Sequence, residues 1–281
     1  MKNPKVLYIL IGTFCFLAII AGVYAEFFVK DVDKNNVIIP SMNHTGDDLA
    51  NEKTQEELKE QFSNLFTNVI NTADYDFTNI QKINMEKEII YSAYDIQKQE
   101  NNYEVDIHLP VFNIKGEVPA GFNSITQNVF ANKASEVLKS NNSYKTIYHV
   151  SYVGYINGDI LSLAIKSTLK EGNNPQRVIV QTYHYNLITG KEENFLECLT
   201  QVGLTQAEVQ TKIQTTVKQA ADEANILLQS GYSVYKRDLN STMYQVPNIT
   251  TFLLGPNGSL YAIFAYGNQN FTSEMDVVLF E

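Results

Sequence analysis

The chain of 281 residues has only two cysteines and no tryptophan. Cys15 lies in an apolar run near the N-terminus, whereas Cys198 lies far downstream in the segment NFLECLTQ. Two cysteines placed in this way exclude a disulfide framework, and they leave no metal site made of thiolates. We expect Cys198 to be a small, buried apolar side chain.

Basic residues are scarce as well. Lys2 and Lys5 are the only charged residues among the first 25, so the rest of the chain holds 19 of the 21 basic residues against all 31 acidic ones, a net charge of −12. This balance excludes nucleic acid and anionic lipid as partners of the main body, because counterion release requires clustered Lys and Arg. It favours a cationic partner through long-range steering, although an acidic surface also serves solubility alone.

Sequence signatures of catalysis are missing. None of the four histidines has a second His or a Cys at a zinc-like spacing, and the sequence has neither a G-x-S-x-G elbow nor a phosphate-binding loop. His108 shares a strand face with Asp106 and Glu104, but strand alternation alone produces such a face. We expect no cofactor and no metal ion.

Two carboxylate pairs, Glu192–Glu193 and Glu274–Asp276, leave enzyme activity open. A pair of carboxyl groups is what the hydrolysis of a glycosidic bond requires. Nothing in the sequence fixes the separation within either pair, so a hydrolase is the second interpretation, behind a protein without catalysis.

Charged residues are absent from one long apolar segment, Val6 to Ala25. As a helix its 20 residues would extend about 30 Å, which matches the hydrocarbon core of a bilayer. Lys2 and Lys5 precede this segment, so the positive-inside rule places the N-terminus in the cytoplasm and the remaining chain outside. We predict a single-pass membrane anchor.

Cleavage after Ala25 is the alternative, because Val23 and Ala25 suit a signal peptidase and would leave a secreted protein. The apolar run is longer than the ~7–15 residues of a typical signal-peptide core, which favours a retained anchor.

The sequence divides into four parts. They are a cytoplasmic tail and anchor over residues 1–25, a flexible acidic tether over 26–53, an N-terminal α+β subdomain over 54–142, and a C-terminal α+β subdomain over 143–281.

Residues 54–142 are expected to begin with a helix. Thr54 and Glu57 form a capping box, and apolar residues at helical spacing continue to Ile70. Two strands follow, EIIYSAYDIQ and YEVDIHLPVFNI, and a second helix is predicted over Ile125–Leu138 with Ile125 facing inward.

Residues 143–281 alternate hairpins with one long helix. Asn157-Gly158 predicts a type I′ turn between two strands, and a third strand follows the loop at 171–175. Thr205 and Glu208 form the capping box of the helix, Gly231 ends it, and three more strands follow, two of them joined by a turn at 257–258. The residues expected on the buried face of this helix are Val209, Ile213, Val217, Ala220, Ala224, Leu227 and Leu228. The hairpins predict an α+β fold of antiparallel sheets with helices packed on one face.

The first candidate for ligand binding is the loop at 171–175, which joins the second and third strands of residues 143–281 and forms the tip of a long two-stranded ribbon. Gly172, Asn173 and Asn174 form this tip, and we expect them to be exposed and adaptable. The acidic Glu274, just before the strand MDVVLF, is a further candidate.

Tyrosines on neighbouring strands are the second group of candidates. Tyr183 and Tyr185 share one strand face, as do Tyr148 and Tyr152. Tyrosine offers rigid contact area with a polar end, which suits the recognition of protein or glycan. Packing against the long helix that begins after Thr205 is the alternative role for these rings.

The strand patterns resemble a known pair of domains. YEVDIHLPVFNI followed by FNSITQNVFANKASEVL resembles the N-terminal member, and SYVGYINGDILSLAIKSTL, LITGK and LGPNGSLYAIFAY resemble the C-terminal member. The pair occurs outside the membrane in RsiV-type anti-sigma factors and beside the catalytic domain of PdaC-type peptidoglycan deacetylases. The resemblance covers about residues 84–281 and implies an envelope protein that binds a cell-wall-related or lysozyme-like ligand.

This sequence departs from those relatives in two ways. Its predicted cytoplasmic tail is five residues long and leaves no sigma-factor-binding part, and no deacetylase domain is present. Where the family often has a Gly-Gly-Ala-His-like tip, this chain has Glu171 to Pro175. We therefore predict a membrane-anchored, extracellular binding or sensing module of a Gram-positive-type envelope, without catalysis, whose ligand is a cell-wall component or a cationic lysozyme-like protein. A cell-wall-modifying hydrolase is the alternative.

Overall fold

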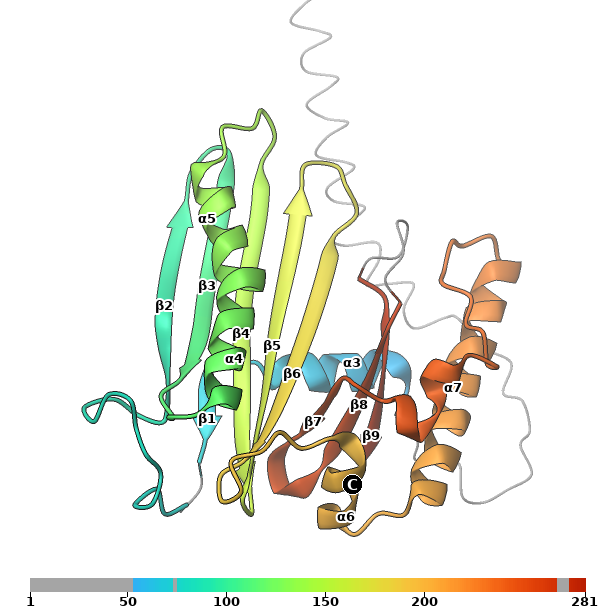
Figure 1. Ribbon diagram of the computed structural model, residues 1–281. Helices are drawn as coiled ribbons and strands as arrows, with labels where there is room; N and C mark the ends of the chain where they lie inside the picture. Colours follow the sequence, from blue (N-terminus) through green and yellow to red (C-terminus); the bar gives the residue numbers. More distant parts are fainter. Residues whose placement is uncertain (1–52, 73–74, 267–272) are drawn as a thin grey trace, which may run out of the picture. The chain divides into compact units, whose positions relative to one another are not determined.

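A computed structural model describes residues 53–72, 75–266 and 273–281 (Figure 1). Lys53–Glu281 forms one compact unit. The predicted membrane segment, Cys15 and nearly all of the predicted tether lie outside the described residues. Among the residues that are described, no helix is both long and apolar enough to cross a bilayer.

A six-stranded mixed sheet is the centre of the unit, with the strand order β2-β3-β4-β5-β6 (Figure 1). These strands are β2 (Ile90–Gln99), β3 (Tyr103–Phe112), β4 (Thr146–Asn157), β5 (Ile160–Glu171) and β6 (Arg177–Asn186). Neighbours are antiparallel except for β3 and β4, which are parallel. The short β1 (Val69–Asn71) also pairs in parallel with β4, beyond Val150, where the pairing of β3 with β4 ends. Strands from both predicted subdomains thus form a single sheet.

One face of this sheet is covered by a helical segment between β3 and β4. It comprises α4 (Glu117–Thr126), a π-helical stretch η2 (Gln127–Ala131) and α5 (Asn132–Lys139). The segment begins eight residues earlier than predicted, and Ile125, expected to face inward, is 46% exposed. The π-helical turn explains the error, because it adds a residue to the helical repeat and shifts the apolar stripe between α4 and α5.

A second, antiparallel sheet packs on the opposite face of the first. It consists of β7 (Phe252–Leu254), β8 (Leu260–Ala265) and β9 (Met275–Phe280). Val153 and Ala164 of the large sheet share a core with Leu253, Ile263 and Val277 of the small one. The outer face of the small sheet packs against α6 (Phe195–Val202), α7 (Gln206–Gln229) and the short helices η3 (Thr242–Tyr244) and η4 (Val246–Asn248), while η5 (Pro256–Gly258) joins β7 to β8. The α+β class is confirmed, but the prediction of antiparallel sheets is wrong for the large sheet, which is mixed because β1 and β3 pair in parallel with β4.

The predicted capping boxes are confirmed. Those of α3 (Gln55–Asn64) and α7 each have the reciprocal hydrogen bonds between Thr and Glu. α3 ends before Val69, which the helical spacing had included, because Asn68 has φ of 60°. Its backbone N–H donates to the Tyr152 carbonyl at 2.8 Å, and its side-chain Oδ1 accepts from the Tyr152 N–H at 3.0 Å. The chain therefore turns into β1 instead of continuing the helix.

The hairpin between β4 and β5 has a different turn from the one predicted. Asn157 pairs with Ile160, which leaves Gly158 and Asp159 as the two loop residues. Only Gly158 has a positive φ, of 56°, as a type II′ turn requires at its first central residue. The sequence predicted Asn157 and Gly158 at the centre of the turn, whereas Gly158 and Asp159 occupy it, one residue later.

α7 ends where its sequence predicts, since Gly231 follows its last turn with φ of 85°. Leu227 and Leu228, which we expected on the buried face, are 44% and 36% exposed. The last buried position of the helix is Ala224, so its final turn extends beyond the core.

Candidate functional site

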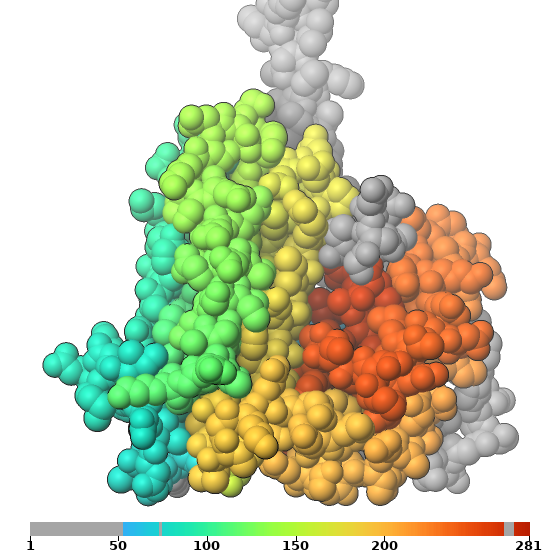
Figure 2. Space-filling model, in the orientation of Figure 1, coloured from blue at the N-terminus to red at the C-terminus, as the bar shows by residue number. Residues whose placement is uncertain are grey.

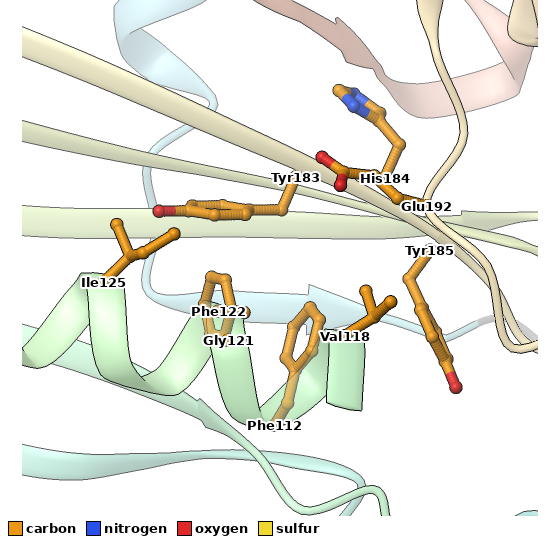
Figure 3. A pocket seen from close by; sticks show the side chains of 9 residues that line it. All are labelled: Phe112, Val118, Gly121, Phe122, Ile125, Tyr183, His184, Tyr185 and Glu192. Atoms are coloured by element: carbon orange, nitrogen blue, oxygen red, sulfur yellow. The ribbon is translucent and has the colours of Figure 1, made fainter. Parts of the chain in front are cut away.

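An aromatic cleft of about 180 Å³ lies between α4 and β6 (Figure 3). Its walls are side chains from both elements, from the end of β3 and from the loop after β6. The lining residues are Phe112, Val118, Gly121, Phe122, Ile125, Tyr183, His184, Tyr185 and Glu192, although the His184 side chain points away from α4 (Figure 3).

The floor of the cleft is held rigidly by the local contacts of α4. The Asn123 side-chain amide accepts a hydrogen bond from the Phe112 N–H at 2.8 Å and donates one to the Phe112 carbonyl at 2.9 Å, which fastens α4 to the end of β3. Phe112 and Phe122 stack with ring centroids 4.0 Å apart, and Tyr183 meets Phe122 edge to face at 4.3 Å. Phe112 and Phe122 are 1% and 3% exposed, so they hold the half-buried Tyr183 in a fixed position from below.

Tyr183 is the lining tyrosine best placed to meet a ligand. Its side chain is half-buried, and its hydroxyl donates to Gln181 Oε1 at 3.0 Å. Desolvation, with the charge of Glu192 as a smaller cause, raises the pKa of Tyr183, so the ring stays neutral at physiological pH. Ile125 from α4 lies on the other side of the cleft (Figure 3).

The size and chemistry of the cleft limit what it can hold. Ligand pockets for whole small molecules are usually about 300–1,000 Å³, so this one suits a single ring or side chain of a larger ligand. Its one carboxylate is that of the exposed Glu192, which the backbone pairing of Glu192 with Tyr185 places beside β6. An apolar or sugar ring that carries a cationic or hydroxyl group matches this lining.

No family model and no curated protein matches the sequence. Among solved structures, the chain is similar to a DUF3298 family protein from Pseudomonas aeruginosa PAO1, with 10% identity, a TM-score of 0.37, and coverage of 68% of this chain and 88% of that chain. A DUF3298 family member from Bacteroides fragilis gives 12% identity and a TM-score of 0.36, with 63% of this chain and 80% of that chain covered. Likenesses this distant assign neither a family nor a function to the chain.

The other predicted tyrosines lie in the core. Tyr148 and Tyr152 are 2% and 4% exposed and pack beneath the helical segment between β3 and β4. They are buried as the alternative expected, but not against the long helix α7, whose apolar face belongs to a different core cluster. Tyr185 is 5% exposed and contributes mainly to the wall of the cleft.

The ribbon tip lies at the far end of β6 from the cleft. Six residues of extended strand, about 20 Å, separate Arg177 from Tyr183. Asn173 and Asn174 are exposed as expected, whereas Gly172 is half-buried against Tyr144. The fold therefore does not bring the tip and the tyrosines together into one site.

Glu274 lies immediately before β9 of the second sheet and is engaged in ion pairs. Its carboxylate is 3.0 Å from Lys59 Nζ and 3.6 Å from Arg237 Nη2. Asp276, its partner in the candidate carboxylate pair, is fully buried and accepts from Arg237 through both oxygens, each at 2.6 Å. The Tyr266 hydroxyl also donates to Asp276, and the Arg237 Nη1 donates to the Ala220 carbonyl at 3.2 Å. This network fastens the segment after α7 to β9, and no sequence motif indicated it.

His108 and His184 contact other side chains of the fold. His108 is 2.8 Å from Asp95 and 3.1 Å from Asp106, with Asp95 contributed by the neighbouring strand. His184 is buried between the two sheets, where its ring stacks on Phe252 at 3.6 Å, and burial lowers its pKa to about 3. Within the described part of the chain, no cluster of three or more His, Cys, Asp or Glu could hold a metal ion.

Cys198 is a free, fully buried thiol, as its sequence context predicted. Burial raises its pKa to about 12, so the thiol is neutral and unreactive at physiological pH.

Replacing Gly121 by alanine should stabilise the protein. A Cβ on Gly121 meets no atom within 4 Å, and glycine inside a helix costs roughly 0.5–1 kcal/mol relative to alanine. We expect the melting temperature of Gly121→Ala to rise by about 2–3 °C. Gly158→Ala is the matched control, because Gly158 has φ of +56° and the same substitution there should lower the melting temperature. An unchanged or lower melting temperature for Gly121→Ala would contradict the open space beside α4.

Proposed function

We propose that this chain is a membrane-anchored, extracytoplasmic binding module of a Gram-positive-type cell envelope. The cleft between α4 and β6 is its ligand site, and residues 6–25 are its anchor. The observation that carries the proposal is the cleft in which the half-buried Tyr183 and the exposed Ile125 lie over the buried rings of Phe112 and Phe122, beside the carboxylate of Glu192.

The ligand is a cell-wall glycan or a cationic, lysozyme-like protein. A half-buried tyrosine beside an exposed isoleucine provides the apolar contact that a sugar face or an inserted side chain requires. The net charge of −12 beyond residue 25 attracts a cationic protein from a distance. The resemblance of residues 84–281 to paired extracytoplasmic domains supports the same cellular location.

Binding should depend on the cleft. The full chain, purified in mild detergent, is titrated with a cationic lysozyme and separately with soluble fragments of purified peptidoglycan. We expect Tyr183→Ala to weaken the binding of one of these probes at least tenfold, and Gly121→Leu to do the same because the new side chain extends into the cleft. If the lysozyme is the ligand, raising NaCl from 50 to 500 mM should also weaken binding.

Tyr232→Ala is the matched control. Tyr232 is 64% exposed and follows α7, away from the cleft, so its removal should leave affinity unchanged. Equal losses for Tyr232→Ala and Tyr183→Ala, or no binding of either probe, would overturn the proposal. Release of sugars or peptides from intact peptidoglycan, abolished by Glu192→Gln, would establish the hydrolase instead.

A further inference from the structure

The outer edge of β6 differs from the outer edges of β2, β7 and β9. An exposed strand edge invites pairing with another chain, and proteins usually protect it. β2, at the opposite edge of the large sheet, has a register shift between Ser92 and Tyr94 and carries the exposed charges Asp95 and Lys98. In the small sheet, β7 is only three residues long, and the buried Gln55 amide on α3 hydrogen-bonds both backbone groups of Val277 in β9.

β6 has none of these protections. Its ten residues form a regular ladder with β5, and Arg177 is its only charged residue. None of residues 177–183 is buried, and Ile179 is 47% exposed. In Figure 2, β6 runs along the surface in yellow, next to a hollow whose floor is formed by the second sheet in red.

The hydrogen bonds at the end of β6 show which backbone groups face outward. The His184 carbonyl accepts from the Glu193 N–H at 3.0 Å, and the Asn186 N–H donates to the Lys191 carbonyl at 2.8 Å, both away from β5. Because backbone direction alternates along a strand, the N–H and C=O groups of Val178, Val180 and Thr182 also face outward. No described residue provides a backbone partner for these six groups.

We propose that this edge pairs with the same edge of a second copy of the chain. The open stretch runs from Arg177 to Tyr183 and is closed at His184 by the loop after β6. Val180 is its midpoint, so two copies related by a two-fold axis at Val180 use the whole stretch. Val180 then lies opposite its own counterpart, and Val178 lies opposite Thr182. All six outward groups of each copy find partners in this register, because antiparallel pairs of outward-facing residues exchange both hydrogen bonds.

The side chains are complementary in the same register. Arg177 of one copy lies opposite Tyr183 of the other, which allows a cation–π contact, and Ile179 lies opposite Gln181. No two like charges face each other across the two-fold axis. The overall charge opposes association, however, since each copy carries −12 beyond residue 25. The contact is therefore expected to be weak, and stronger at high salt.

The mass of the full chain in detergent, measured by light scattering over a range of concentrations, tests this inference. We expect a concentration-dependent dimer that is stronger in 500 mM than in 50 mM NaCl. Ile179→Lys should weaken it at least tenfold. Ile226→Lys is the matched control, because Ile226 is similarly exposed, at 51%, but lies on α7. The dimer should also survive Gly121→Leu, so its loss and the loss of ligand binding are separable.

Cross-linking tests the register directly. In a Cys15→Ser background, Val180→Cys places two thiols on residues whose Cα atoms are about 5.5 Å apart across the two-fold axis, within the range of a disulfide. We expect mild oxidation to convert most Val180→Cys chains to a covalent dimer, whereas Lys98→Cys on β2 should stay largely monomeric. A monomer at all concentrations would overturn the inference. So would a dimer that resists Ile179→Lys, or preferential cross-linking through Lys98→Cys.

Discussion

Replacing Arg237 by methionine is expected to lower the free energy of unfolding by about 3–5 kcal/mol, the largest effect that the structure predicts for a single substitution. Asp276 has no exposed side-chain surface, and Arg237 provides two hydrogen bonds to its carboxylate. Methionine fills a similar volume but leaves the buried Asp276 carboxylate with the Tyr266 hydroxyl as a donor and the Lys59 ammonium 4.0 Å away. Urea denaturation followed by circular dichroism measures the loss.

The double variant Arg237→Met with Asp276→Leu is the control for this prediction. Replacing a buried ion pair by apolar residues of similar volume is often neutral or stabilising. We therefore expect the double variant to regain at least half of the lost stability. If it is as unstable as Arg237→Met alone, packing around Arg237, and not the uncompensated charge of Asp276, determines the effect.

Acid should destabilise the protein through His184. Burial lowers the pKa of this side chain from 6.5 to about 3. As the pH falls below 6.5, the unfolded chain takes up a proton that the folded chain cannot accommodate until about pH 3. The stability contributed by the neutral imidazole is complete above pH 6.5 and is lost progressively below it, by about 3 kcal/mol at pH 4.

Unfolding in urea at pH 7, 5.5 and 4 measures this dependence. His184→Phe keeps an aromatic ring against Phe252 but has no titrating group. Between pH 7 and 4 its free energy of unfolding should therefore fall by about 3 kcal/mol less than that of the wild type. His149→Phe is the control, because the His149 side chain is 45% exposed, and it should follow the wild type. Equal pH dependence in His184→Phe and the wild type would show that His184 is protonated without cost.

Local features of the fold were predictable from the sequence. Capping boxes, the glycine that ends α7 and the hairpins of β4–β6 and β7–β8 depend on residues close together in the chain, and the structure confirms them. The burial of Cys198 followed from its apolar surroundings. Errors arose where a local pattern was compatible with two outcomes, as for Val69, which fits helical spacing but lies in β1 after the turn at Asn68.

Long-range pairing was not predictable. The parallel contact of β3 with β4 and that of β1 with β4 join segments that no local signal connects. Arg237 and Asp276 are 39 residues apart, and neither stands in a motif. Strand alternation identified Tyr183, but its partner Phe122 was missed because the predicted helix began after it. An earlier start for that helix, at the Gly116–Glu117 step, would have placed Phe122 on the helix facing the sheet.

The first helix of the unit is fastened to the last strand. Lys53 lies 3.5 Å from the carboxylate of Glu281, and the Gln55 amide bridges the backbone of Val277, 222 residues away in the chain. Tension applied to the N-terminal end of this unit is therefore carried first by α3 and β9, before it reaches the large sheet. Of these two links, loss of Glu281 alone would remove only the exposed Lys53–Glu281 ion pair, whereas loss of β9 would also remove the backbone partner of Gln55 and part of the core around Leu58 and Phe62.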